Sequence, residues 1–282
     1  MFDSCFGFWL SYSYLTNTNK IIIYHFHSIH TLHTVRNNLV NLRLHIAPVG
    51  FEIDRIVIPA KDMKADKVWL LVHENPSDDK ALPFVEKIQK QLKKANIKVG
   101  IEYHNRLDLF QIIKTTKELI EKESPNDIFV NMASGSKIQA IALMMTCMMF
   151  GKEKRVTPFY AEAEDYPGFA GKQMSYGVKN IMQLPIYKMQ VPKFELIQAL
   201  KIVKENKGRI TKKQMAKLAV DEKLIVVNAK DENVSQATFA SLDKNIIQPL
   251  QDQWKFIETE KIGRNRWIKI TQEGINAAEF LT

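Results

Sequence analysis

Between residues 42 and 163, short apolar segments alternate with longer amphipathic ones, and this alternation restricts the fold more than any other feature. The apolar segments are rich in Val, Ile and Leu, as is typical of strands, and they are 42–50, 66–74, 97–104, 127–133 and 155–163. The segments between them repeat apolar residues every three or four positions, which predicts helices at 51–63, 78–96, 107–123 and 135–151. Crossovers of this length predict an α/β domain, a Rossmann-like and mainly parallel sheet with helices on both faces.

Length and composition limit the classes of protein that remain possible. At 282 residues and 45% hydrophobic content, the chain is long enough to form the cores of two domains. The apolar run IALMMTCMMF is about half the length that a bilayer-spanning helix needs, so no membrane segment is expected. Two cysteines, Cys5 and Cys147, fit neither a disulfide framework nor a zinc motif, which favours a reducing cytoplasm. The net charge of +9 indicates nucleic acid or another anion as a partner.

The first 41 residues differ from the rest of the chain. They are aromatic, poor in charge and without a consistent period of two or 3.6 residues. No basic segment precedes the apolar run FGFWLSYSYL and no small-residue cleavage site follows it, so a signal peptide is not expected. The histidines at positions 25, 27, 30 and 33 have no Cys, Asp or Glu among them, and we assign them no metal. We expect a poorly ordered extension over 1–41, with the natural start near Val40.

A turn after the fourth expected strand is the first candidate site. It lies in NMASGSKIQAIAL, residues 131–143, between the apolar run DIFV and a helical pattern. Ligands of open parallel sheets bind beyond the carboxyl ends of the strands, where helix N-termini present unpaired N–H groups. We therefore expect an anion beside Asn131, Ser134, Gly135, Ser136 and Lys137. The spacing matches neither a Walker A loop nor a dinucleotide fingerprint, and the alternative is that the two serines only cap the helix.

A second loop is expected at the same sheet edge. In HIAPVGFEIDR, residues 48–51 follow the first strand, so that two loops line one pocket. This pair of loops, together with the strand count, resembles the CARF family of CRISPR-associated Rossmann-fold sensor domains over about residues 43–188. The resemblance implies that ligand phosphates or riboses contact Gly50, Phe51, Glu52, Ser134, Gly135, Ser136 and Lys137.

Beyond Val191 the pattern changes to short helices and a hairpin. Helical periods are expected at 192–210, 211–220 and 232–250. The second of these opens on a capping box of Thr211 and Gln214, and Pro249 is expected to kink or end the third. The segment WKFIETEKIGRNRWIKITQEG alternates apolar and polar residues, which predicts a β-hairpin, and a last helix INAAEFL follows it. This order predicts a winged helix-turn-helix domain.

Such a domain places its third helix in the major groove of DNA, while the wing contacts the backbone or the minor groove. The side chains suited to these contacts are Ser235, Gln236, Thr238, Lys244, Arg264 and Arg266. Residues 191–282 contain 16 Lys plus Arg against 12 Asp plus Glu, a modest excess of positive charge. Double-stranded DNA is the favoured partner, and a winged helix that binds protein is the alternative.

The two expected domains, over 42–190 and 191–282, resemble together the archaeal stand-alone CARF transcriptional regulators. The resemblance implies a cytoplasmic homodimer in which a cyclic oligoadenylate, or a related nucleotide, bridges Lys137 of both subunits and changes DNA affinity. The alternative is a ring nuclease, in which Ser134, Ser136 and Lys137 stabilise cleavage of the cyclic ligand. No histidine lies in the turn to act as a base, while His45 and His104 suit strand ends or the core. We expect that the protein is not an enzyme, and we assign no catalytic residue, metal or cofactor.

Overall fold

The computed structural model describes residues 41–282 except 76, 78, 153, 168–171 and 228–232. The expected extension over 1–41 therefore lies outside the described residues apart from Asn41, and so do its four histidines. In the described part of the chain, no helix combines the length and the apolar composition that a membrane crossing requires.

A six-stranded sheet with the order β3-β2-β1-β4-β5-β6 forms the first half of the fold. Its strands are β1 (Arg43–Pro48), β2 (Lys67–His73), β3 (Lys98–His104), β4 (Asp127–Asn131), β5 (Val156–Glu162) and β6 (Asn180–Gln183). The strands β1 to β5 pair in parallel, and β6 is antiparallel to β5. The predicted Rossmann-like, mainly parallel sheet is confirmed.

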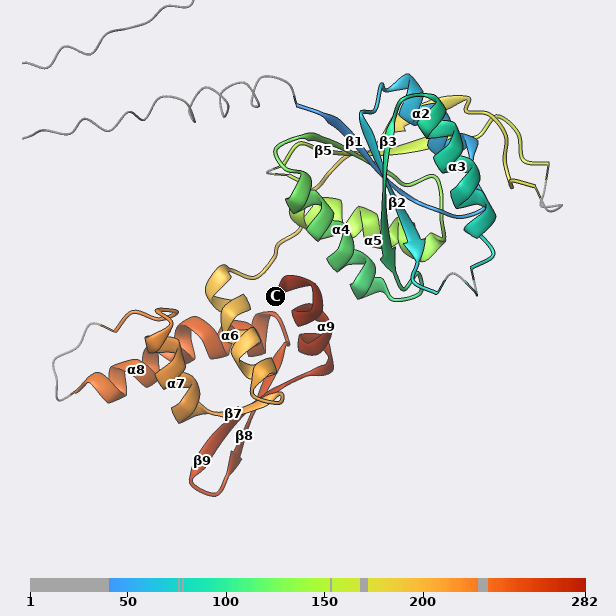
Figure 1. Ribbon diagram of the computed structural model, residues 1–282. Coiled ribbons are helices and arrows are strands. Elements are labelled where there is room, and N and C mark those ends of the chain that lie inside the picture. Colours follow the sequence, from blue (N-terminus) through green and yellow to red (C-terminus); the bar gives the residue numbers. More distant parts are fainter. Residues whose placement is uncertain (1–40, 76, 78, 153, 168–171, 228–232) are drawn as a thin grey trace, which may run out of the picture. The chain divides into compact units, whose positions relative to one another are not determined.

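Helices cover both faces of this sheet (Figure 1). They are α2 (Asp54–Asp62), α3 (Leu82–Lys94), α4 (Leu109–Glu123) and α5 (Lys137–Phe150). Because side chains alternate along a strand, neighbouring residues of β2 pack on opposite faces. Leu70 belongs to the core that contains Ile88 of α3, whereas Leu71 belongs to the core that contains Leu119 of α4. Most residues of β1 and β2 are buried because helices cover both faces of the sheet.

The second half contains a three-stranded antiparallel sheet with the order β7-β9-β8. Its elements are α6 (Phe194–Glu205), β7 (Arg209–Thr211), α7 (Lys212–Asp221), α8 (Val234–Leu242), β8 (Ile257–Ile262), β9 (Asn265–Ile270) and α9 (Gln272–Leu281). Leu200, Ile210, Ile246 and Ile268 belong to one buried core that joins the helices to the sheet. The predicted winged helix fold is confirmed.

Two details of the second half differ from the sequence prediction. The helix expected over 192–210 ends at Glu205, because Lys207 and Gly208 adopt positive φ angles of 59° and 77° and turn the chain into β7. The third helix does not end at Pro249 but continues from α8 through two π-helical turns, Asp243–Ile247 and Pro249–Gln253. Pro249 lies inside this continuous helix, where it has no N–H to donate to the preceding turn.

Candidate functional site

The two loops predicted to share a sheet edge are in contact. The Ser134 hydroxyl donates to the Pro48 carbonyl oxygen at 2.7 Å, and Ser134 is only 3% exposed. A Cβ added to Gly50 would lie 3.0 Å from the Gly135 Cα. Gly135 itself has φ of +77°, and an added Cβ there would lie 2.7 Å from the Cβ of Pro48. Two glycines are therefore needed for this close approach of the loop after β1 to the turn after β4.

A reciprocal pair of hydrogen bonds caps the N-terminus of α5. The Ser136 hydroxyl accepts from the Gln139 N–H at 3.3 Å, and the Gln139 Oε1 accepts from the Ser136 N–H at 2.8 Å. Ser136 thus has the capping role that the sequence left as an alternative, whereas Ser134 binds β1 instead of the helix. Lys137, the first residue of α5, is exposed. The N–H groups of Lys137 and Ile138 have no acceptor within the helix and are available to an anion.

Asn131 connects three parts of the site. It lies at the end of β4 and is 1% exposed. Its Nδ2 donates to the Arg55 carbonyl oxygen of α2 at 2.8 Å, and its Oδ1 accepts from the Ala133 N–H at 2.7 Å. Asn131 therefore braces the turn after β4 and connects it to the first turn of α2.

Glu52 and Phe51 face other partners within the first loop. The Glu52 carboxylate lies 3.5 Å from Nη1 of Arg55, and its second oxygen accepts from the Ser175 hydroxyl. The Phe51 ring packs edge-on against Phe84 at 5.5 Å between ring centroids. The Arg55 guanidinium offsets the negative charge that Glu52 brings to an anion site. Pro48 and Gly50 directly approach the turn after β4.

His104, at the end of β3, contacts the same helix N-terminus. Its Nε2 lies 2.9 Å from Nε2 of Gln139. Because the Gln139 Oε1 already accepts from Ser136, the amide nitrogen must donate, and the imidazole Nε2 accepts. His104 is 1% exposed, and burial, followed by the nearby charges of Arg106 and His73, lowers its pKa to about 4. Neutral His104 therefore positions Gln139 at neutral pH.

Sequence reasoning placed His104 at a strand end or in the core, and it missed the contact with Gln139. The sequence feature that could have predicted this contact was the parallel order of the strands, because β3 then ends at the same sheet edge as β1 and β4. Arg106 was also missed; it follows His104 and forms an ion pair with the buried Asp79. The second histidine, His45, is a core residue as expected. It lies 5.3 and 5.4 Å from the rings of Phe129 and Phe159, and burial lowers its pKa to about 4.

The expected absence of a metal motif can be compared with the structure only where residues are described. Among those residues, no three His, Cys, Asp or Glu side chains are grouped to hold a metal ion. Cys147 is a buried free cysteine of α5, and burial raises the pKa of its thiol to about 12. A thiol with so high a pKa is unreactive at neutral pH.

The candidate DNA-binding residues of the third helix divide between two grooves. Ser235 and Thr238 line a groove of about 440 Å³ between α7 and α8, together with Lys213 and Lys217 of α7. Gln236 is exposed next to them on α8. Lys213 and Lys217 were missed by sequence reasoning, although their spacing of four residues places them on one face of a helix.

Lys244 lies apart from that group. It lines a different groove, of about 940 Å³, together with the adjacent Asn245. The two grooves have no lining residue in common. Of the four helix residues proposed from the sequence for DNA, Ser235 and Thr238 therefore line one groove and Lys244 lines another.

The wing is a tight hairpin with exposed arginines. Ile262 pairs with Asn265, so the turn has two residues, Gly263 with φ of 59° and Arg264. Arg264 and Arg266 are both exposed near this tip. At the base of the wing, Arg209 lies 2.8 Å from the Glu260 carboxylate and stacks over the Trp267 ring at 4.4 Å. These contacts connect β7 to the hairpin and fix the direction of its tip.

Two protein families match separate parts of the chain. Residues 43–166 match the family described as HFX_2341-like, N-terminal, and residues 195–282 match the DUF6293 C-terminal winged helix domain. The uncharacterized protein MJ1513 of Methanocaldococcus jannaschii is 27% identical over 229 residues, which are 71% of this chain and 68% of that protein.

Two solved structures match the chain at low TM-scores. Can2 from Sulfobacillus thermosulfidooxidans, in complex with cyclic tetra-adenylate, matches at a TM-score of 0.38 and 12% identity over 85% of this chain and 63% of the Can2 chain. Csm6 from Enterococcus italicus, bound to cyclic hexa-2'-fluoro-hexa-dAMP, matches at 0.37 and 10% identity over 76% of this chain and 56% of its own. The chain thus spans less than two thirds of either protein.

The family matches follow the order of elements in the structure. The first match covers β1 to β5 with helices α2 to α5, and the second covers α6 to α9 with the three-stranded sheet. Residues 43–166 are therefore similar to the HFX_2341-like N-terminal family, and residues 195–282 are similar to the DUF6293 C-terminal winged helix domain.

Proposed function

We propose that this protein is a DNA-binding transcriptional regulator whose α/β domain senses an anionic nucleotide of the cyclic oligoadenylate class. The observation that carries the proposal is the contact between the two loops at the N-terminus of α5. Ser134 binds Pro48, and Gly50 meets Gly135, so that Lys137 begins its helix beside the first loop. This arrangement supports one binding site built from both loops.

The chemistry of this edge favours an anion. The capping box uses the N–H groups of Ser136 and Gln139, which leaves those of Lys137 and Ile138 without a partner in the helix. The helix dipole adds partial positive charge at the same place, and the Lys137 ammonium group adds a full one. Because Glu52 is paired with Arg55, the neighbouring carboxylate opposes an anion less than a free one would.

The proposed ligand class and the homodimer follow from the resemblance of these loops to the CARF family. On α5, Ile141 lies one turn beyond Lys137 and is 54% exposed, so a contact between two copies through this face would cover an apolar side chain. A two-fold contact through this face brings both Lys137 residues toward one symmetric ligand. A cyclic oligonucleotide has the repeated phosphates that such a pair of sites requires.

The winged helix domain supplies the proposed DNA contact. Ser235 and Thr238 share their groove with Lys213 and Lys217, so hydroxyl and ammonium groups lie together beside α8. The exposed Arg264 and Arg266 add charge at the wing. Ammonium and guanidinium groups bind phosphate oxygens, while hydroxyls suit base edges or backbone.

Isothermal titration calorimetry of the full chain with cyclic tetra-adenylate tests the sensor assignment. We expect saturable binding to the native chain and loss of binding in Lys137→Ala, because the ammonium group pairs with ligand phosphate. Lys94→Ala is the matched control, since Lys94 is an exposed lysine at the C-terminal end of α3. Absence of binding to the native chain, or an equal loss in both variants, contradicts the assignment.

The mixture of protein and cyclic tetra-adenylate also distinguishes ligand sensing from slow cleavage of the ligand. His104 is buried and its Nε2 is bonded to Gln139, so a ring nuclease here depends for charge stabilisation on Ser136, Lys137 and the free N–H groups at the start of α5. Chromatography of the ligand after incubation is expected to recover the cyclic form. Accumulation of linear product, lost in Lys137→Ala, assigns the ring nuclease activity instead.

A further inference from the structure

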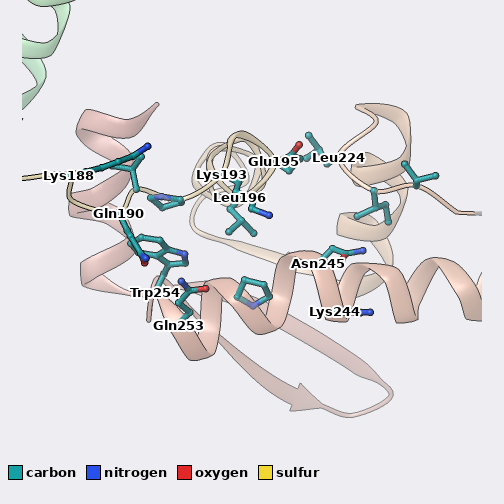
Figure 2. Close-up of a pocket in the computed structure, with 15 residues that line it drawn as sticks. Lys188, Gln190, Lys193, Glu195, Leu196, Leu224, Lys244, Asn245, Gln253 and Trp254 are labelled. Carbon is teal, nitrogen blue, oxygen red and sulfur yellow. The ribbon is translucent and has the colours of Figure 1, made fainter. Parts of the chain in front are cut away.

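The winged helix domain has a second groove, larger than the one beside α7. It has a volume of about 940 Å³ and lies between the segment 188–193, the start of α6, the segment 224–226 and the helix that continues from α8. Figure 2 shows Trp254 and Gln190 toward one end of the groove, with Lys244 and Asn245 toward the other. Neither the sensor site nor the proposed DNA contact of Ser235 and Thr238 uses this groove.

The floor of the groove is apolar. Leu196, Leu224 and Ile225 line it as buried side chains, and Trp254 and Pro249 also line the groove. Val226 lines the edge with 75% of its surface exposed. Val226 therefore adds exposed apolar surface to the groove.

The rim of the groove is basic. Lys193 and Lys244 line it together with one glutamate, Glu195. The groove also adjoins the N-terminus of α6, whose N-cap residue Lys193 makes no side-chain capping hydrogen bond. The uncapped N–H groups and the helix dipole add to the positive potential of the rim.

The positive charge of the rim distinguishes between two candidate occupants of the groove. A second copy of the chain would bring its own lysine-rich rim against the first, and like charges oppose such a contact. A partner with acidic side chains around an apolar stripe matches both the rim and the floor. We propose that this groove binds an acidic amphipathic helix of a partner protein. The helix inserts leucine-like side chains spaced at i, i+4 and i+7 over the floor, and its carboxylates face the lysines.

The groove is compatible with simultaneous DNA binding. Its lining residues are distinct from those of the groove that contains Ser235, Thr238, Lys213 and Lys217. The helix running from Val234 to Gln253 therefore presents different side chains to the two grooves. A regulator that holds DNA on one groove and an acidic helix on the other can recruit a protein to its promoter, and this role goes beyond ligand sensing.

A synthetic helix of about 18 residues, with leucine at i, i+4, i+7 and i+11 and glutamate at most other positions, is the probe. Fluorescence anisotropy of the labelled peptide is measured against the full chain. Two further peptides serve as comparisons, one with lysine replacing glutamate and one with serine replacing leucine. We expect micromolar, saturable binding of the acidic peptide only.

Charge reversal locates the binding. Lys193→Glu combined with Lys244→Glu is expected to weaken the affinity for the acidic peptide by about tenfold and to permit binding of the lysine peptide. The matched control reverses Lys213 and Lys217 on the other groove and is expected to leave peptide binding within about twofold. Circular dichroism verifies that both variants fold.

Three outcomes overturn the proposal. The first is no saturable binding of the acidic peptide, and the second is equal binding of the serine peptide, which would show attraction by charge alone. The third is an equal loss in the control variant. Because the assay contains neither nucleotide nor DNA, its failure leaves the sensor and operator assignments unaffected, and their failure leaves this one unaffected.

Discussion

His45 and His104 show how burial sets the charge of single residues in the α/β domain. His45 is enclosed by Phe129 and Phe159, and His104 is bonded to Gln139 at the proposed site. Burial lowers the pKa of each imidazole from 6.5 to about 4. Both side chains are therefore neutral in the folded protein down to acidic pH, whereas in the unfolded chain they gain protons near pH 6.5.

This difference predicts a pH dependence of stability. Between pH 6.5 and 4 the unfolded chain binds more protons than the folded one, so the free energy of unfolding falls as pH falls, by about 3 kcal/mol for each histidine. In His45→Leu, one of these contributions is absent. Urea denaturation at several pH values is expected to show a smaller loss in the variant than in the native protein. Equal losses of unfolding free energy in the two proteins would show that His45 does not cause the pH dependence.

At the scale of elements, the turn between β4 and α5 depends on Gly135. An alanine there must keep φ near +77°, and its Cβ would meet Pro48. We expect Gly135→Ala to lower the free energy of unfolding by about 2 to 3 kcal/mol and to weaken binding of cyclic tetra-adenylate, because the two loops must separate.

Gly263 of the wing is the matched control for Gly135. It also has a positive φ, of +59°, but an added Cβ there meets nothing within 4 Å. Gly263→Ala is expected to cost about 1 kcal/mol from backbone conformation alone and to leave ligand affinity unchanged. Denaturation and calorimetry measure both effects. Equal effects of the two substitutions on ligand affinity would contradict the contact between the loops.

The third helix of the winged helix domain leads to a prediction about DNA. Lys217 shares a groove with Ser235 and Thr238, whereas Lys244 lines the groove on which we place a protein partner. Lys217→Ala is expected to weaken DNA binding and to reduce the slope of log affinity against log salt by about one. Lys244→Ala is expected to change neither quantity by more than about twofold in affinity. The reverse order of effects would assign Lys244 to the DNA surface.

Periodicity was sufficient to predict the elements but not the contacts between them. The five parallel strands, the capping box at Thr211 and the wing around Gly263 follow from local pattern, whereas capping by Ser136 was only an alternative. The three-residue strand β7 is too short to have a period, and the π-helical turns have no sequence signature that we used. The bonds from Ser134 to Pro48 and from Gln139 to His104 join residues 86 and 35 positions apart, so only the folded chain shows them.

At the scale of the whole molecule, a nucleotide shared between two Lys137 side chains requires a dimer through α5. Ile141 is 54% exposed there, and a buried aspartate in an apolar contact is costly. Ile141→Asp is therefore expected to convert the protein to monomers in analytical ultracentrifugation and to weaken nucleotide binding. Ile262→Asp is the control, because Ile262 is 50% exposed but belongs to the wing hairpin. A native chain that sediments as a monomer, or dissociation by the control alone, contradicts the proposed dimer face.

The central claim is that a nucleotide at Lys137 controls DNA binding by the winged helix domain. The most direct test is the affinity of the full chain for its operator at fixed salt, with and without saturating cyclic tetra-adenylate. We predict that the ligand changes the affinity of the native protein at least about fivefold, in either direction. Lys137→Ala is predicted to keep the affinity measured without ligand and to lose the response. An unchanged affinity of the native protein at saturating ligand would contradict the account.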